Sequence, residues 1–130
     1  DAPDTDFHVK LVDVYPPNED YPAGFAMNLT HGVLRARYRD GFENEVMMRQ
    51  GEVYRIVVQA FPTANLFAAG HRIRLDISSS NFPHFDVNPN SGEPEGFGRT
   101  PQVARNRVYV DAHRPSRLIL PVTEGGEAGL

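Results

Sequence analysis

The sequence predicts an all-β fold, a sandwich of short strands, and three observations support this class. Apolar and polar residues alternate with a period of two in several short segments, most clearly over residues 71–78. The 11 Gly and 11 Pro residues supply turns between these segments and oppose long helices. Hydrophobic residues make up 40% of the chain, which permits a single core. Short strands with regular turn signals favour a sandwich over a sheet that alternates with helices.

The first three predicted strands lie in the first third of the chain. In the segment 7–14, every second residue is apolar up to Leu11, and the pattern then shifts to Val12. This shift predicts either a β-bulge or a strand that is buried on both faces. A short second strand is predicted at 25–29, where alternate residues are apolar. The third, at 34–39, alternates apolar residues with arginines, so one of its faces is charged.

Four further strands are predicted in the rest of the chain. The segment 53–61 is the longest of them, has apolar residues on both faces, and ends at Pro62 because proline lacks a backbone donor. The segment 71–79 alternates apolar with charged residues before a loop rich in Asn, Pro, Ser and Gly. Two short segments, 107–111 and 117–122, complete the set.

The domain is predicted to occupy residues 1–122, followed by a flexible tail at 123–130. No apolar run approaches the roughly 18 residues of a membrane span, so no membrane contact is expected. The absence of Cys excludes disulfides and thiolate metal sites and is compatible with the expected cytoplasmic location, while secretion stays open. A net charge of −4 argues against a nucleic-acid partner.

Motifs in a fixed order relate the chain to a known family. They are the opening DTDF at 4–7, GVLRARYR at 32–39, PTANLF at 62–67, the run GHRIRLDISSSNFPHFDVNPNSG at 70–92, and RPSRLILPV at 114–122. Over nearly its whole length the chain thus resembles the C-terminal domain of the cocaine esterase-like (CocE/NonD) and X-Pro dipeptidyl-peptidase serine hydrolases. Small departures are Arg49-Gln50 in place of Glu-Pro, and His84 and Val87 in place of Arg.

The resemblance implies a jelly-roll (galactose-binding-like) β-sandwich that follows a catalytic α/β-hydrolase domain and braces it. No residue here matches a catalytic triad position of the family, so the resemblance implies no catalytic residue, cofactor or metal ligand in this chain. It also implies that the first strands of the sandwich are missing. The expected partner is therefore the hydrolase domain of the parent enzyme or a second chain that completes the sandwich, and a homo-oligomer stays open.

Arginines on the predicted strands are the first candidate interaction residues. They could dock the hydrolase domain or pair across strands through bidentate ion pairs, in part with Asp76. The alternatives are a solvated sheet face, in which each pair contributes little, and a site for an acidic ligand. The arginines concerned are Arg35, Arg37, Arg72 and Arg74.

The loop after residue 79 holds a second group of candidates. Asp86, Asn88 and Asn90 alternate as calcium ligands do, but Ser91 and Phe97 stand where an EF-hand loop needs Gly and Glu. The sequence therefore favours Asx-turns, in which Asp and Asn side chains bind their own backbone.

Aromatic residues of the same loop are expected to pack it onto the sandwich or against the hydrolase domain. They are Phe82, Phe85 and Phe97, and Asn81 at the start of the loop is grouped with Phe82, Asn88 and Asn90 as interdomain or structural.

Two other function classes are alternatives to the accessory domain. An independent hydrolase is disfavoured because the serines at 78–80 stand outside any Gly-x-Ser-x-Gly nucleophile elbow. A carbohydrate- or ligand-binding module stays as the alternative, supported by analogy of fold alone. The sequence does not choose among esterase, acylase and dipeptidase for the parent enzyme.

Overall fold

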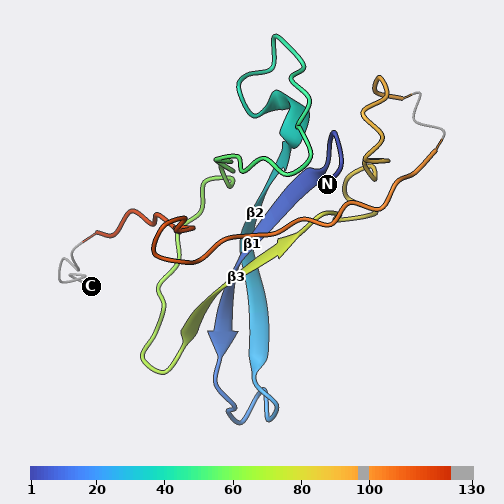
Figure 1. Ribbon diagram of the computed structural model, residues 1–130. Coiled ribbons are helices and arrows are strands. Elements are labelled where there is room, and N and C mark those ends of the chain that lie inside the picture. The colour runs from blue at the N-terminus through green and yellow to red at the C-terminus, as the bar shows by residue number, and fades with distance from the viewer. Residues whose placement is uncertain (97–99, 124–130) are drawn as a thin grey trace.

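The computed structural model describes residues 1–96 and 100–123, and its centre is one antiparallel sheet (Figure 1). Its strands are β1 (Asp6–Tyr15), β2 (Phe25–Arg35) and β3 (Arg72–Ser78), in the order β2-β1-β3. The one helical element of the described residues is a 3-10 turn, η1 (Ala36–Tyr38). These observations confirm the predicted all-β class. Phe97 and the predicted tail from residue 124 onward lie outside the described residues.

The bulge predicted in the first strand lies in β2 instead, because Leu11 pairs with Thr30 and Val12 with Asn28, which leaves Leu29 of β2 as the extra residue. β1 and β2 pair from Asp6 opposite Arg35 to Tyr15 opposite Phe25, and the register shifts between Leu11 and Val12. Neighbouring residues of a strand point to opposite faces. Leu11 is nevertheless only 8% exposed and Val12 only 3%, so β1 is also buried on both faces at this point.

The two faces of the sheet differ in how they are covered. Residues directly opposite each other in a sheet share a face, so Leu11 lies beside Leu75, and His8 lies beside Ser78 on the other face. The face of His8 is covered by the loop after β3, whose Phe85 ring lies 5.4 Å from the His8 ring. On β3 the face of Leu11 carries the apolar residues Ile73, Leu75 and Ile77, and it is open to solvent there.

The third predicted strand is wrong, because the chain leaves the sheet after Arg35. Residues 36–38 form η1 instead of continuing the ladder. The backbone N–H of Ala36 still donates to the carbonyl of Thr5 at 2.9 Å, but that of Arg37 donates to the side chain of Asp4. In a strand, the N–H of Arg37 would donate to the backbone of a neighbouring strand, but here it donates to the Asp4 carboxylate.

Three other predicted strands, 53–61, 107–111 and 117–122, are extended chain without a ladder in the described residues. Their side-chain alternation is that of strands, but a strand also needs a neighbour for its backbone donors and acceptors. Apolar side chains in them remain exposed, for example Val57 at 69% and Val110 at 81%. The segment 53–61 forms one such bond at its end, from the N–H of Phe61 to the carbonyl of His31.

That end of the segment crosses β2 at close range. The hydroxyl of Thr30 donates to the carbonyl of Phe61 at 2.7 Å. At Gly32, a Cβ atom would lie 2.5 Å from the backbone oxygen of Gln59, so only glycine fits without a shift. The apolar face is therefore covered beside β2, whereas its β3 side stays open.

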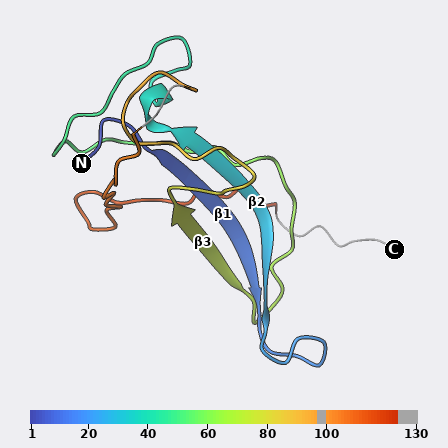
Figure 2. The same ribbon diagram turned by 90° about the vertical axis from the view of Figure 1, so that its right-hand side faces the viewer.

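The N-terminus, η1 and the loop at 79–95 gather at one end of the sheet, and the hairpin at 16–24 lies at the other (Figure 1 and Figure 2). The end with the N-terminus and η1 holds most of the polar contacts described below. Among the helices that the structure describes, none is long and apolar enough to cross a membrane.

Candidate functional site

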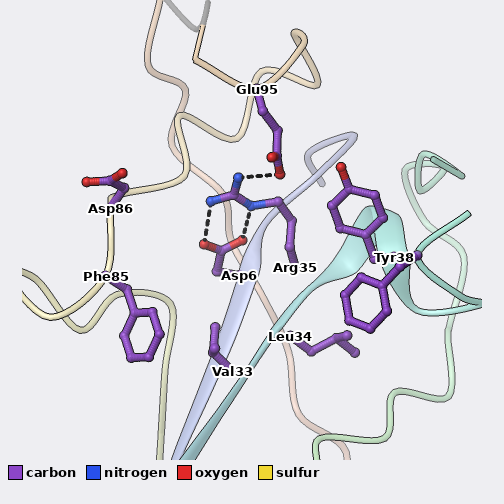
Figure 3. A pocket seen from close by; sticks show the side chains of 9 residues that line it. Asp6, Val33, Leu34, Arg35, Tyr38, Phe85, Asp86 and Glu95 are labelled. Atoms are coloured by element: carbon purple, nitrogen blue, oxygen red, sulfur yellow. Dashed lines mark hydrogen bonds and ion pairs between the residues drawn. The ribbon is translucent and has the colours of Figure 1, made fainter. Parts of the chain in front are cut away.

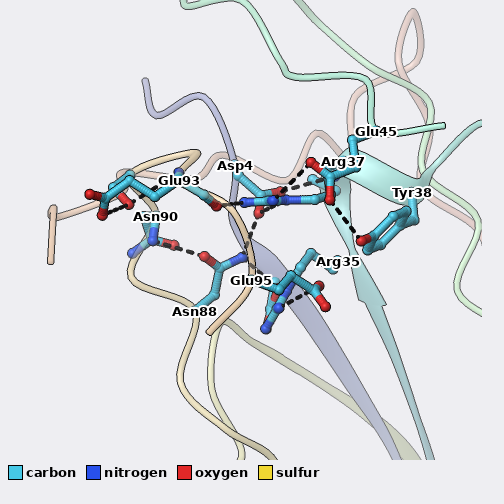
Figure 4. Close-up of polar contacts among 12 residues, drawn as sticks. Asp4, Arg35, Arg37, Tyr38, Glu45, Asn88, Asn90, Glu93 and Glu95 are labelled. Carbon is cyan, nitrogen blue, oxygen red and sulfur yellow. Dashed lines mark hydrogen bonds and ion pairs between the residues drawn. The ribbon is translucent and has the colours of Figure 1, made fainter. Parts of the chain in front are cut away.

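A buried ion pair lies at the gathered end of the sheet. The Arg37 Nε atom donates to Asp4 Oδ2 at 2.8 Å, and the side chains are 2% and 0% exposed. The remaining guanidinium nitrogens donate to Glu45 Oε2 at 3.2 Å and to the backbone carbonyl of Glu93 at 2.9 Å. Arg37 thus joins three segments that are distant in the sequence (Figure 4).

Asn88 extends this network to the start of β1. Its Nδ2 atom donates to Asp4 Oδ2 at 2.9 Å and to Asp6 Oδ1 at 2.7 Å. Its Oδ1 atom accepts from the backbone N–H of Asn90 at 2.8 Å, which is an Asx-turn. The side chain is 3% exposed. Asn88 therefore holds the loop in place and offers its amide to two carboxylates.

Arg35 forms a second, less buried ion pair. Its Nε and NH2 atoms donate to the two oxygens of Asp6 at 2.9 and 3.1 Å, and its NH1 atom donates to Glu95 at 2.8 Å (Figure 3). The bond to Asp6 is the main reason why the pKa of Arg35 is raised. The bidentate geometry fixes the guanidinium plane between both carboxylates.

Beside Arg35 the surface is hollowed into a recess of about 350 Å³. Tyr38 lies on one side of it and Phe85 on the other (Figure 3). The ring of Phe42, which also lines the recess, lies 5.7 Å from the ring of Tyr38. The full lining consists of Asp6, Val33, Leu34, Arg35, Tyr38, Phe42, Phe85, Asp86 and Glu95.

Carboxylates surround the phenol of Tyr38. Its hydroxyl donates to Glu45 Oε1 at 3.0 Å. The pKa of Tyr38 is raised by loss of solvent, by this hydrogen bond, and by the charges of Glu95 and Glu45.

A separate set of hydrogen bonds connects the segment before β3 to Asp13 of β1. Asp13 is fully buried and contacts His71 Nδ1 at 2.9 Å, while Asn65 Nδ2 donates to its other oxygen at 3.1 Å. His71 stands before β3, and Ser78 ends it. At about 3.3 Å per residue, they lie roughly 20 Å apart, so this His–Asp pair has no nucleophile in the serine run.

The predicted arginines divide into two pairs. Arg35 and Arg37 meet in the network above. Arg72 and Arg74 lie on β3, which β1 separates from β2. Arg74 pairs with Asp76 at 2.9 Å on the surface, and Arg72 is exposed.

The predicted loop residues also differ in burial. Asn88 is buried, and Asn90 Nδ2 donates to the carbonyl of Gln102 at 2.9 Å. The backbone carbonyl of Asn81 accepts from the N–H of His84 at 2.9 Å. Phe82 is 72% exposed.

Sequence reasoning missed the acidic half of the network. Asp4 and Asp6 were noted only as part of a motif, although they are spaced by two residues, as Arg35 and Arg37 are. Such spacing puts each pair on one face of an extended chain. With the antiparallel register of Asp6 opposite Arg35, this match is the signal that could have found the network.

Comparison with known proteins identifies the family of the chain. The family model described as the X-Pro dipeptidyl-peptidase C-terminal non-catalytic domain matches residues 1–119. Cocaine esterase of Rhodococcus sp. is 38% identical over 123 residues, which are 93% of this chain and 20% of that protein. A protein described as a serine esterase of Mycobacterium bovis is 30% identical over 79% of this chain and 17% of its own length.

A solved structure supports the same relationship. An aminopeptidase from the marine sediment archaeon Thaumarchaeota archaeon superposes with a TM-score of 0.61 and 29% identity, over 72% of this chain and 16% of that one. The chain therefore spans at most about a fifth of the length of these relatives. Since the matching family model covers residues 1–119, the chain belongs to the family of X-Pro dipeptidyl-peptidase C-terminal non-catalytic domains.

Proposed function

We propose that this chain is an accessory β domain that braces the α/β-hydrolase domain of a serine hydrolase. The observation that carries the proposal is the open apolar face of β3. Ile73, Leu75 and Ile77 form one row on this face and are 51%, 37% and 43% exposed. A row of large apolar side chains in water marks a surface that another protein segment covers.

The edge of β3 supports the same conclusion. β3 pairs with β1 on one side and is one of the two outer strands of the sheet. An outer strand offers unpaired backbone groups to an added strand. The relatives are about five times as long as this chain, and a parent enzyme of that size would supply the covering segment.

The reaction of the parent enzyme would be hydrolysis of an ester, amide or X-Pro peptide bond. The relatives named as esterases and as an aminopeptidase support this range. The role of the present chain would be to position the hydrolase domain, whose own residues would carry out the reaction.

The test is to express the parent hydrolase as two pieces, this chain and the remainder, and to examine their assembly by native mass spectrometry. We expect a one-to-one complex, hydrolysis by the complex, and none by this chain alone. Leu75→Asp should prevent assembly because it places a charge on the apolar face. Arg74→Asp is the matched control, since its side chain lies on the opposite face. A failure of the unaltered pieces to associate would contradict the proposal.

A carbohydrate- or ligand-binding module is the second candidate. The recess lined by Tyr38, Phe42 and Phe85 is the observation in its favour, because aromatic rings are common in ligand sites. Binding on a glycan array that Phe42→Ala abolishes would support this function over the bracing role.

A further inference from the structure

The recess at the end of the sheet combines aromatic walls with an excess of negative charge. Tyr38 lies on one side and Phe85 on the other (Figure 3), and the ring of Phe42 lies beside that of Tyr38. Phe42 is 82% exposed, so the rim is open. Such an opening suits a side chain that projects from a neighbouring protein surface.

The charges of the recess do not balance. The residues that line it include three acidic ones, Asp6, Asp86 and Glu95, and one cationic one, Arg35. Arg35 uses Nε and NH2 on Asp6 and NH1 on Glu95, so its guanidinium is fully engaged. Asp86 is exposed and forms no ion pair with the described residues. Two negative charges are therefore left in excess.

We propose that this recess receives the side chain of an arginine or lysine residue of the hydrolase domain. The inference rests on the proposed bracing function and names the chemistry of one contact in it. Aromatic faces attract a cation by their quadrupole, and the carboxylates of Asp86 and Glu95 supply charge-assisted acceptors. A neutral sugar would leave these carboxylates without a counter-charge, and an anion would be repelled.

The state of Tyr38 supports a negative potential in the recess. Besides its burial and its hydrogen bond to Glu45, the charges of Glu95 and Glu45 raise its pKa, while Arg37 opposes them. The acidic side chains therefore outweigh the nearby arginine at the phenol, and a cation beside the ring would meet a favourable field.

The first test identifies what occupies the recess in the full-length hydrolase. Phe42 is replaced by the photo-crosslinking residue p-benzoylphenylalanine, and crosslinked peptides are sequenced by mass spectrometry. We expect a peptide of the hydrolase domain with an arginine or lysine at or beside the crosslinked residue. Crosslinks to a segment without a cationic residue, or none to the hydrolase domain, would overturn the inference.

The second test measures the contribution of the charge. Asp86→Asn removes a carboxylate that has no ion pair within the described residues, so the fold should be retained. In the two-piece assembly we expect association to weaken on the order of tenfold and to depend less on salt. Asp20→Asn, on the hairpin at the other end of the sheet, is the control and should have no effect.

The outcomes separate this inference from the proposed function. If the unaltered pieces do not associate, the bracing role fails. If they associate and Asp86→Asn has no effect, only the cationic contact fails. Tetramethylammonium could change the NMR chemical shift of Phe42 while no crosslink to the hydrolase domain forms. This pair of results would assign the recess to a small cation and overturn the inference.

Discussion

Arg37 and Asp4 form two hydrogen bonds with each other, one through the Arg37 backbone N–H at 2.9 Å and one through Nε at 2.8 Å. Both side chains are buried, so neither charge is solvated by water. Desolvation offsets much of the attraction in such a pair, but loss of one partner leaves a buried charge uncompensated. The pair therefore acts chiefly by fixing where the N-terminal segment and η1 lie relative to each other.

Replacement of Arg37 by Ala should lower the free energy of unfolding by about 3–5 kcal/mol. The reason is that Asp4 would remain buried without its cation. The measurement is urea unfolding of the chain. Arg72→Ala is the control, because Arg72 is exposed, and it should change the stability by less than about 0.5 kcal/mol. Equal effects of the two changes would contradict the assigned role of the buried pair.

Asn88→Asp should destabilise the fold more than its small change in volume suggests. The new carboxylate would replace an amide that now donates to Asp4 and Asp6, so three carboxylates would meet in a buried space. Repulsion raises the pKa of such a group, so part of the lost stability should return as the pH falls. Thermal unfolding at several pH values measures this recovery.

The matched control for that change is Asn18→Asp. Asn18 Oδ1 accepts from the N–H of Tyr21 at 2.8 Å, an interaction that a carboxylate retains. We expect nearly unchanged stability. If Asn88→Asp were equally mild at neutral pH, the amide of Asn88 would not be essential to the network.

The core strands follow from the sequence because their patterns are satisfied within the chain. β3 falls inside the predicted segment 71–79, and the shift of the apolar pattern from Leu11 to Val12 marks the point where β1 is buried on both faces. Such local signals depend on side-chain alternation, which a single sequence contains. The segment 53–61 has the same signal, but a strand also depends on a neighbour, which alternation does not reveal.

The sequence predicted the arginines of the candidate site but not their acidic partners, because these partners also depend on contacts that alternation does not reveal. Alternation placed Arg35 and Arg37 on a charged face, whereas in the structure Arg37 is buried and bonded to Asp4, Glu45 and the backbone of Glu93. The contact between Arg37 and the loop at 88–93 spans more than fifty residues of sequence. Long-range pairs of this kind leave no periodic pattern, so they require the fold itself.

Gly32→Ala should detach the segment 59–61 from β2. The added Cβ would lie 2.5 Å from the backbone oxygen of Gln59, and a backbone atom cannot rotate away as a side chain does. Overpacking of this kind costs about 1–3 kcal/mol. Hydrogen exchange of the Phe61 amide, which now donates to His31, should become faster.

Thr30→Ser is the control for that experiment, because it retains the hydroxyl that donates to the Phe61 carbonyl. It should leave the exchange of the Phe61 amide almost unchanged. Slow exchange in both variants would show that the close approach at Gly32 does not hold the segment.

His8 should make the stability of the chain depend on pH. The ring is 2% exposed, packs against Phe85, and its Nε2 atom has no hydrogen-bond partner in the described residues. Burial lowers its pKa below 6.5, and the charges of Lys10, His31 and Arg35 act in the same direction against the opposing effect of Asp6. The folded state therefore disfavours the imidazolium.

Between the lowered pKa and 6.5, the unfolded chain binds more protons at His8 than the folded chain. The free energy of unfolding should thus fall as the pH drops below 6.5, and this component should level off below the folded pKa. His8→Leu removes the titrating group, so its urea midpoint should decline less over this range than that of the unaltered chain. His84→Leu changes an exposed histidine and should keep the full decline. Parallel pH profiles for all three proteins would show that burial of His8 does not govern the acid sensitivity.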